Sequence, residues 1–193
     1  MSSKQRVMAG KPKVGGAVFR APLGTALPTS ARTPLPDTYI ELGYVSADGW
    51  SRKVDKAYEA VNAWGGDEVS KSRTEHSVGF SMDLIENLNA ATQTAKWGTA
   101  AVKVTPATTD HGNLTTVTYD GDDTGPAVWV FDMEDQGKLH RTVFPNAIDT
   151  TESFEQTFSD SDVVALPFDM SAYRDDTGTY FIDYTDDGAT KAA

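Results

Sequence analysis

The chain has 193 residues, no cysteine and a formal net charge of −11. The lack of cysteine excludes disulfide frameworks, thiolate metal sites and cysteine nucleophiles. A chain of this length can bury a hydrophobic core large enough to fold without disulfide bonds or a structural metal ion. Its acidic balance argues against tight binding to nucleic acid, because such binding usually needs basic groups that neutralise phosphates.

Residues 1–36 form a basic segment at the start of this acidic chain. They contain six Lys and Arg and no Asp or Glu, whereas residues 97–193 contain 18 Asp and Glu against five Lys and Arg. Gly and Pro allow no more than one short strand, near residues 14–19. We therefore predict an extended arm that becomes ordered only against a partner, and the opposite charge of the body favours contact between copies.

No signal peptide and no membrane insertion are expected. The first six residues carry charge but no apolar stretch follows them. Elsewhere no apolar run approaches the ~18 residues that a membrane-spanning helix needs.

From Thr38 onward the sequence favours strands. Residues 39–45 are predicted as a strand that ends in a turn at 46–49. Residues 76–84 alternate apolar and polar side chains, which predicts a strand with one buried face. Hairpin corners are expected at residues 120–121 and 136–137. Further strands are predicted at residues 100–105, 114–119, 126–133, 138–144, 162–171 and 179–185.

One helix is predicted, over about residues 84–97. Asp83 and Glu86 resemble a capping box, and Gly98 stands where a helix would end. In residues 54–64 the apolar side chains also recur at helical spacing, so pattern alone favours a second helix there. Many short strands with a helix indicate a mainly β fold, an antiparallel sandwich or barrel with that helix on one flank.

The acidic residues permit a glycoside hydrolase interpretation, in which two carboxylates act as acid and nucleophile. Asp132 and Glu134 share a strand face, and Glu152 and Glu155 lie in the following loop. In a chain with 28 Asp and Glu such pairs arise by chance, so solvated surface side chains are the better interpretation. No catalytic residue is assigned.

No cofactor or metal site is predicted either. None of His76, His111 and His140 has a second ligand at metal-binding spacing. The acidic residues 120–123 lack the spacing of a calcium loop and are typical of a turn.

Two of the tryptophans could contact either another subunit or a carbohydrate. Trp129 lies within an apolar strand and is expected in the core. Trp50 follows the predicted turn, and Trp64 precedes Gly65 and Gly66. An aromatic side chain there suits a contact between subunits, which we favour, or a carbohydrate-binding platform. A carbohydrate-binding β-sandwich module is therefore the main alternative function.

Several short motifs, in this order and spacing, resemble the major tail proteins of long-tailed, non-contractile bacteriophages, particularly those infecting actinobacteria. The motifs are GKPKVGGAV at residues 10–18, APLGT at 21–25, LPT at 27–29, LGYVSADG at 42–49 and AWGGDEV at 63–69.

The resemblance implies the tail-tube fold, a β-sandwich or barrel with a flanking helix and extended arms. Residues 52–69 would then be extended rather than helical. It also implies an arm at residues 1–36, a β domain at 37–186 and a short tail at 187–193. Subunits of this family have no active site and form hexameric rings that stack into a hollow tube.

The resemblance also implies partners and a location. The partners are further copies of the chain and the tape measure, terminator and distal tail proteins, while double-stranded DNA passes transiently through the tube. The location is the virion tail, assembled in the cytoplasm of the host bacterium. The acidic C-terminal half would line the channel, because basic contacts would retard DNA.

Contacts between subunits are predicted for charged and apolar residues of the arm and for two tryptophans. These residues are Lys11, Lys13, Val14, Val18, Phe19, Leu23, Trp50 and Trp64. On this hypothesis, a chain without residues 1–36 folds but does not polymerise. Charge reversal at Lys11 and Lys13 should weaken stacking most at low salt.

Overall fold

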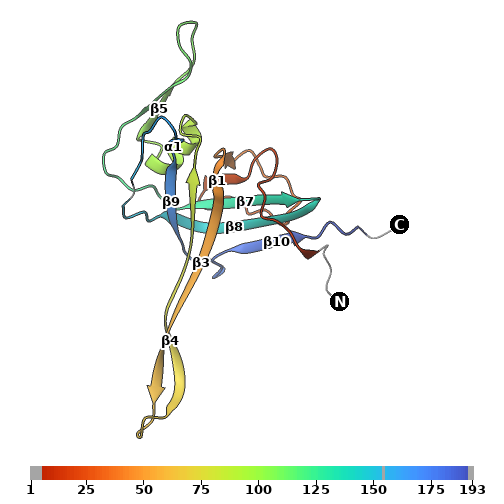
Figure 1. The fold of residues 1–193 in the computed structure, drawn as a ribbon, viewed down its shortest axis with the longest axis vertical. Coiled ribbons are helices and arrows are strands. Elements are labelled where there is room, and N and C mark those ends of the chain that lie inside the picture. Colours follow the sequence, from red (N-terminus) through yellow and green to blue (C-terminus); the bar gives the residue numbers. More distant parts are fainter. Residues whose placement is uncertain (1–5, 154, 191–193) are drawn as a thin grey trace.

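The computed structural model describes residues 6–153 and 155–190. Within them, antiparallel strands and a single α-helix make up the fold (Figure 1), which confirms the predicted mainly β fold class. The elements are β1 (Val18–Pro22), β2 (Ile40–Glu41), β3 (Val45–Asn62), β4 (Glu68–Leu84), α1 (Ala90–Trp97), β5 (Val102–Thr105), β6 (Leu114–Val117), β7 (Ala127–Asp135), β8 (Lys138–Asp149), β9 (Leu166–Ala172) and β10 (Ile182–Asp186).

Eight of the described strands form one sheet in the order β2-β1-β7-β8-β9-β4-β3, with β10 beside β8. Strand β8 pairs with β7 along one edge, and β9 and β10 share its other edge. Strands β5 and β6 form a separate hairpin that projects beyond α1 (Figure 1).

The main core lies where the sheet folds over on itself. Trp50 of β3 stacks on Phe131 of β7 with 4.2 Å between ring centroids. Phe80 of β4 lies 4.4 Å from Phe144 of β8, also between centroids. The predicted core residue Trp129 is 1% exposed and lies in the same cluster. The alternation that predicted a strand at 76–84 is thus explained by one face of β4 turned into this core.

A second core lies on the opposite face of β1, β7 and β8. Val128 and Val130 of β7 are buried there with Val143 of β8. Strand β7 is therefore apolar on both faces, and the second face needs a cover. Part of the cover is Tyr39, which is buried, and part is the segment before it, through the partly buried Leu27.

The described part of residues 1–36 accordingly packs on the body, which differs from the expected free arm. Strand β1 lies inside the sheet, between β2 and β7. Its Val18 and Ala21 are each 1% exposed. Residues 1–5 of the predicted arm and 191–193 of the predicted tail lie outside the described residues.

A buried arginine connects the N-terminal segment to β7 and β8. Arg141 is 2% exposed and donates two hydrogen bonds of 2.6 Å to the carboxylate of Asp132. Its remaining terminal nitrogen donates to the carbonyl oxygens of Ser30, at 2.9 Å, and Thr33, at 2.7 Å. One side chain therefore neutralises a buried acid and satisfies two backbone groups of the N-terminal segment.

The predicted helix is present but begins later than expected. The predicted start at residue 84 is wrong, because Leu84 ends β4 and is fully buried. The N-cap is Asn89, whose side chain accepts a hydrogen bond from the Ala91 N–H, so the capping box at Asp83 and Glu86 is also wrong. Gly98 ends the helix as predicted.

The turn predictions had mixed outcomes. Gln136 and Gly137, with φ of 54° and 79°, join β7 to β8 as predicted. The turn expected at 46–49 is wrong, because these residues form an irregular part of β3. The Asp-Gly corner at 120–121 does not make a hairpin, because the strands before and after it do not pair with each other. Residues 54–64 are not helical and belong mostly to β3, as the resemblance implied.

Candidate functional site

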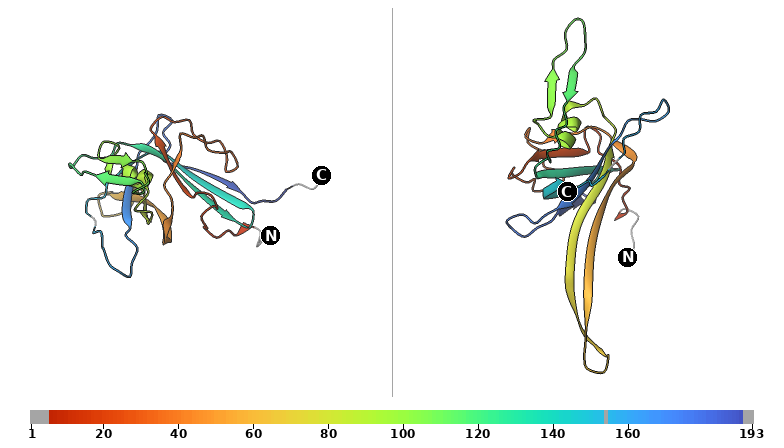
Figure 2. Two further views of the ribbon diagram at one scale, coloured as in Figure 1. Left: turned by 90° about the horizontal axis from the view of Figure 1, so that it is seen from above. Right: turned by 90° about the vertical axis from the view of Figure 1, so that its left-hand side faces the viewer.

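The outer parts of β3 and β4 project from the body as a two-stranded ribbon, residues 53–77 (Figures 1 and 2). Strand β9 supports β4 only from Val78 onward. Every residue of the ribbon except Ala57 and His76 is exposed. An isolated two-stranded hairpin is at best marginally stable in water, so this ribbon would gain stability from a partner surface.

The tip of the ribbon presents Trp64 to solvent. Its exposed fraction is 107%, so its ring is free of contacts that would cover it. The turn is closed by the Gly66 N–H, which donates to the Ala63 carbonyl at 3.0 Å. Gly65 and Gly66 have φ of 116° and 95°, a region that favours glycine.

The two faces of the ribbon differ in charge. Side chains alternate along a strand, and directly opposed residues share a face. One face, here called the basic face, carries Val54, Lys56, Tyr58 and Ala60 of β3 opposite His76, Arg73 and Lys71 of β4. The other, here called the acidic face, carries Lys53, Asp55, Ala57, Glu59 and Val61 opposite Ser77, Glu75, Ser72 and Ser70.

The environment of His76 reflects this separation of charge. Its pKa is lowered, first by burial and then by the positive charges of Arg73, Lys56 and Arg174. The His76 ring lies 4.9 Å from the ring of Tyr180, between centroids. Positive charge therefore accumulates on this face of a chain that is acidic overall.

The base of the ribbon is held by Arg52. Its guanidinium donates to the two carboxylate oxygens of Asp183 in β10, at 3.0 and 2.8 Å, and lies 4.0 Å from the ring centroid of Phe181. The same carboxylate accepts a hydrogen bond of 2.7 Å from Thr142 and lies 3.3 Å from His140 Nε2. This cluster connects β3 to β8 and β10 where the ribbon leaves the body.

The Asp183 cluster makes stability depend on pH. Burial alone would raise the pKa of Asp183, but hydrogen bonds from Thr142, Arg52 and His140 and the charge of Arg52 lower it below its usual value. The carboxylate therefore stabilises the fold above about pH 4, and this contribution disappears as pH falls through the lowered pKa. We expect Asp183→Asn to cost about 1–2 kcal/mol at pH 7, since solvent screens part of the interaction, and much less at pH 3.

Urea unfolding at both pH values measures this effect, with Asp123→Asn at an exposed position as the control. The control should change the free energy of unfolding little at either pH. An equal loss for Asp183→Asn at pH 7 and pH 3 would contradict the role of its charge.

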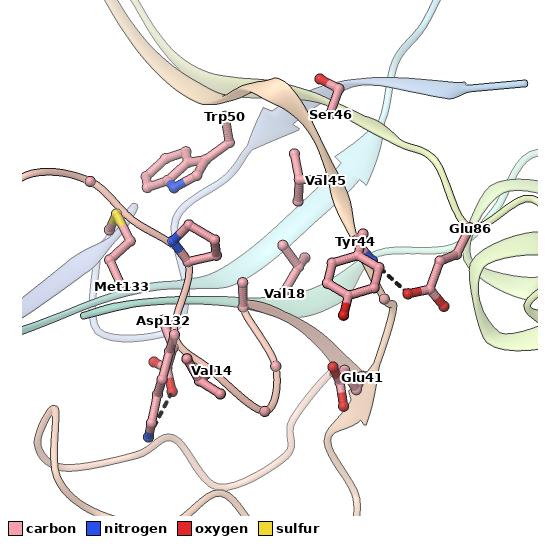
Figure 3. Close-up of a pocket in the computed structure, with 18 of the residues that line it drawn as sticks. Val14, Val18, Glu41, Tyr44, Val45, Ser46, Trp50, Glu86, Asp132 and Met133 are labelled. Carbon is pink, nitrogen blue, oxygen red and sulfur yellow. Dashed lines mark hydrogen bonds and ion pairs between the residues drawn. The ribbon is translucent and has the colours of Figure 1, made fainter. Parts of the chain in front are cut away.

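A cleft of about 530 Å³ lies beside the base of the ribbon (Figure 3). It separates the segment before β1 from the start of β3. Its walls include the apolar side chains of Val14, Val45 and Met133. At one end the Tyr44 N–H donates to the carboxylate of Glu86 at 3.0 Å. The cleft is thus an apolar seam between two parts of the sheet rather than a pocket of converging polar groups.

The predicted contact residues fall into two groups in the structure. Val18 is in the core, Phe19 packs against the second core, and Trp50 stacks on Phe131. The prediction that Val18 contacts another subunit is wrong, because its side chain is 1% exposed. Phe19 and Trp50 are partly buried by their own chain. By contrast, Val14, Leu23 and Trp64 are 95%, 50% and 107% exposed and remain available.

The two predicted lysines are engaged within their own chain. Lys11 Nζ lies 3.0 Å from Asp135, and Lys13 Nζ lies 3.9 Å from Asp132. The pKa of Asp135 is lowered, first by the hydrogen bond from the Ala9 N–H and then by that from Lys11. Charge reversal at these lysines would therefore disturb attachment of the N-terminal segment, as well as any contact between subunits.

The paired carboxylates considered for glycoside hydrolysis do not form a free pair. Asp132 is buried and bound by Arg141, which corrects its interpretation as a solvated surface group. Among the described residues no group of three or more His, Asp or Glu is placed to hold a metal ion. In the same part of the chain, no helix combines the length and apolarity needed to cross a membrane.

Sequence reasoning missed the residues that position the ribbon and the N-terminal segment. Arg52, Arg141 and Asp183 were not singled out, because their partners are far away in the chain. The two faces of the ribbon did have a weak signal, the acids Asp55 and Glu59 at odd-numbered positions with Lys56 at an even-numbered one, which the helical spacing of the apolar residues obscured.

Comparison of the chain with models of known protein families gives no match, and a search of curated protein sequences gives none either.

Proposed function

We propose that the chain is a structural subunit that assembles with copies of itself into stacked hexameric rings, forming the tail tube of a long-tailed, non-contractile bacteriophage. The observation that carries this proposal is the ribbon at residues 53–77, exposed on both faces and ending in the exposed Trp64. A ribbon of this kind gains stability from a second surface. The motif resemblance supports the choice of a tail tube among self-assembling structures.

The edge of the sheet supports assembly as well. Strand β3 ends the strand order, and no described strand pairs with its other edge. Exposed edges of this length are sites where another chain can add a strand. Repeated contacts between two different surfaces build rings when they close and filaments when they do not.

In the proposed tube, DNA passes without binding tightly. A channel lined by acidic or neutral groups serves this purpose, and 18 of the 28 acidic residues lie in the C-terminal half. The tape measure, terminator and distal tail proteins are the further partners that this function requires. The location proposed is the virion tail, after assembly in the bacterial cytoplasm.

The alternative functions receive less support from the geometry. A carbohydrate platform built from Trp50 and Trp64 would need both rings on one surface. Trp50 stacks on Phe131 in the body, whereas Trp64 lies in the turn at the ribbon tip. A glycoside hydrolase would need a free pair of carboxylates, and Asp132 is bound by Arg141.

Electron microscopy of the purified protein tests the proposal, with a variant in which Asn-Gly replaces residues 55–77. This dipeptide suits a two-residue turn, and it would join Val54 to Val78, which are directly opposed in the sheet. We expect tubes or six-fold rings from the natural chain at high concentration. The variant should be a folded monomer with an unchanged melting temperature.

Persistent monomers of the natural chain at all salt concentrations, together with binding to sugars, would contradict the proposal. Tubes formed equally well by the shortened variant would exclude the ribbon as the assembling element.

A further inference from the structure

We infer that the ribbon joins copies of the chain face to face, with the basic face of one ribbon lying on the acidic face of the ribbon of a second copy. This inference rests on the proposed self-assembly and specifies the contact that would carry it. The partner is thus the same segment of another copy, chosen by its charge.

The first argument is the arrangement of charge within the ribbon. On the basic face Lys56, Lys71 and Arg73 share the surface with one acid, Glu68 near the tip, 3.4 Å from Lys71. On the acidic face Asp55, Glu59 and Glu75 share the surface with one lysine, Lys53, 2.9 Å from Asp55. Each face therefore keeps an excess of two charges of its own sign.

The second argument is that the ribbon does not pair these charges across its two strands, since its two ion pairs, Lys53–Asp55 and Glu68–Lys71, each lie within one strand. Opposite charges placed directly across a sheet contribute roughly 0.2–1 kcal/mol per pair. Between residues 53 and 77, all of which the structure describes, no directly opposed pair joins opposite charges. Lys56 faces His76, Tyr58 faces Arg73, and Glu59 faces Ser72. Placing charge this way leaves it available for a partner.

The third argument is the apolar surface that accompanies the charge. On the basic face Val54 and Tyr58 are 44% and 56% exposed, and on the acidic face Val61 is 49% exposed. The two faces belong to the same strands, so they have the same length and width. Two such ribbons can stack as layers of a sheet do, with apolar side chains in contact and charges paired between them.

The geometry of the contact suits a repeating assembly. Because the two faces differ, a pair of stacked ribbons still leaves one basic and one acidic face free. A third copy can then add in the same way, and the series closes into a ring or continues as a filament. Like faces repel each other, so stacking in the wrong orientation is disfavoured.

Charge exchange between the faces tests the inference. One variant, Lys56→Glu with Arg73→Glu, makes both faces acidic, and a second, Glu59→Lys with Glu75→Lys, makes both basic. We expect each alone to associate at least about tenfold more weakly than the natural chain in sedimentation velocity at low salt. An equimolar mixture of the two should regain association, and so should one chain with all four changes, because opposite faces then meet again.

Arg6→Glu with Lys103→Glu is the matched control for Lys56→Glu with Arg73→Glu, since it lowers the net charge by the same amount at exposed positions outside the ribbon. It should associate like the natural chain, and all variants should keep their melting temperature. If the natural chain associates and the single-face variants associate equally well, the inference fails and the proposed function stands.

A natural chain that stays monomeric at every concentration overturns the inference and the proposed function together. Loss of binding to a labelled DNA duplex on Lys56→Glu with Arg73→Glu, with association unchanged, would identify the basic face as a site for polyanions and overturn the inference.

Discussion

Removal of residues 1–36 is expected to abolish cooperative folding. The deletion takes out β1, which lies between β2 and β7, and exposes the second face of β7 at Val128 and Val130. It also leaves the buried guanidinium of Arg141 without its two carbonyl acceptors. Since a domain is stable by only about 5–15 kcal/mol, this combined loss of burial and hydrogen bonds exceeds what the fold can tolerate.

Thermal unfolding followed by circular dichroism measures this result. A shorter truncation that removes residues 1–8 is the control, because it leaves β1 and the segment that covers β7 in place, and it should melt cooperatively. A cooperative transition in the chain without residues 1–36, close to that of the natural chain, would instead support a free arm.

Substitution of Arg141 is expected to give a large loss of stability from a single residue. Arg141→Ala leaves the buried carboxylate of Asp132, 4% exposed, with only the half-exposed Lys13 at 3.9 Å, and it leaves the carbonyls of Ser30 and Thr33 without donors. Breaking one side of a buried ion pair typically costs about 3–5 kcal/mol. Denaturant unfolding at pH 7 measures the change in the free energy of unfolding.

Two further variants show whether burial is the reason. Lys11→Met removes the exposed half of the ion pair with Asp135 and should cost less than about 1 kcal/mol. Arg141→Met combined with Asp132→Leu should recover part of the loss, because the unpaired charge is gone while the two carbonyls remain unsatisfied. A loss for Arg141→Ala no larger than that for Lys11→Met would contradict the argument.

The parts of the fold that follow from local patterns were predictable. In β4, residues 76–84 alternate because one face is buried, and Gly98 ends α1 because the chain there has a φ of 86°. The start of α1 was missed because Leu84 fits a helical and a strand pattern equally well. Only the packing of Leu84 in the core decides between the two.

The ribbon was harder to predict from its residues alone. Val54, Ala57, Tyr58 and Val61 suggest a helix by their spacing, yet in β3 they are divided between the two faces of the ribbon. Neither face is buried by the chain itself, so no alternation of apolar and polar residues marks this strand. The resemblance to tail proteins favoured the extended form, and β3 confirms it.

That Val18 and Phe19 pack within their own chain was missed for a different reason. Gly and Pro restrict local conformation but do not indicate whether a segment packs on its own domain or on another copy. The N-terminal segment packs on its own domain because it covers the second apolar face of β7 and accepts hydrogen bonds from the guanidinium of Arg141. Both lie about 100 residues later in the chain. Such distant pairings become visible only in three dimensions.

The position of the ribbon outside the core separates two properties of the chain. The residues that stabilise the subunit lie in the body, whereas nearly all residues from 53 to 77 are in contact with solvent. If copies assemble through the ribbon as proposed, substitutions there alter which copies recognise one another without endangering the fold. Closely related chains produced in the same cell could in this way diverge into sets that do not mix.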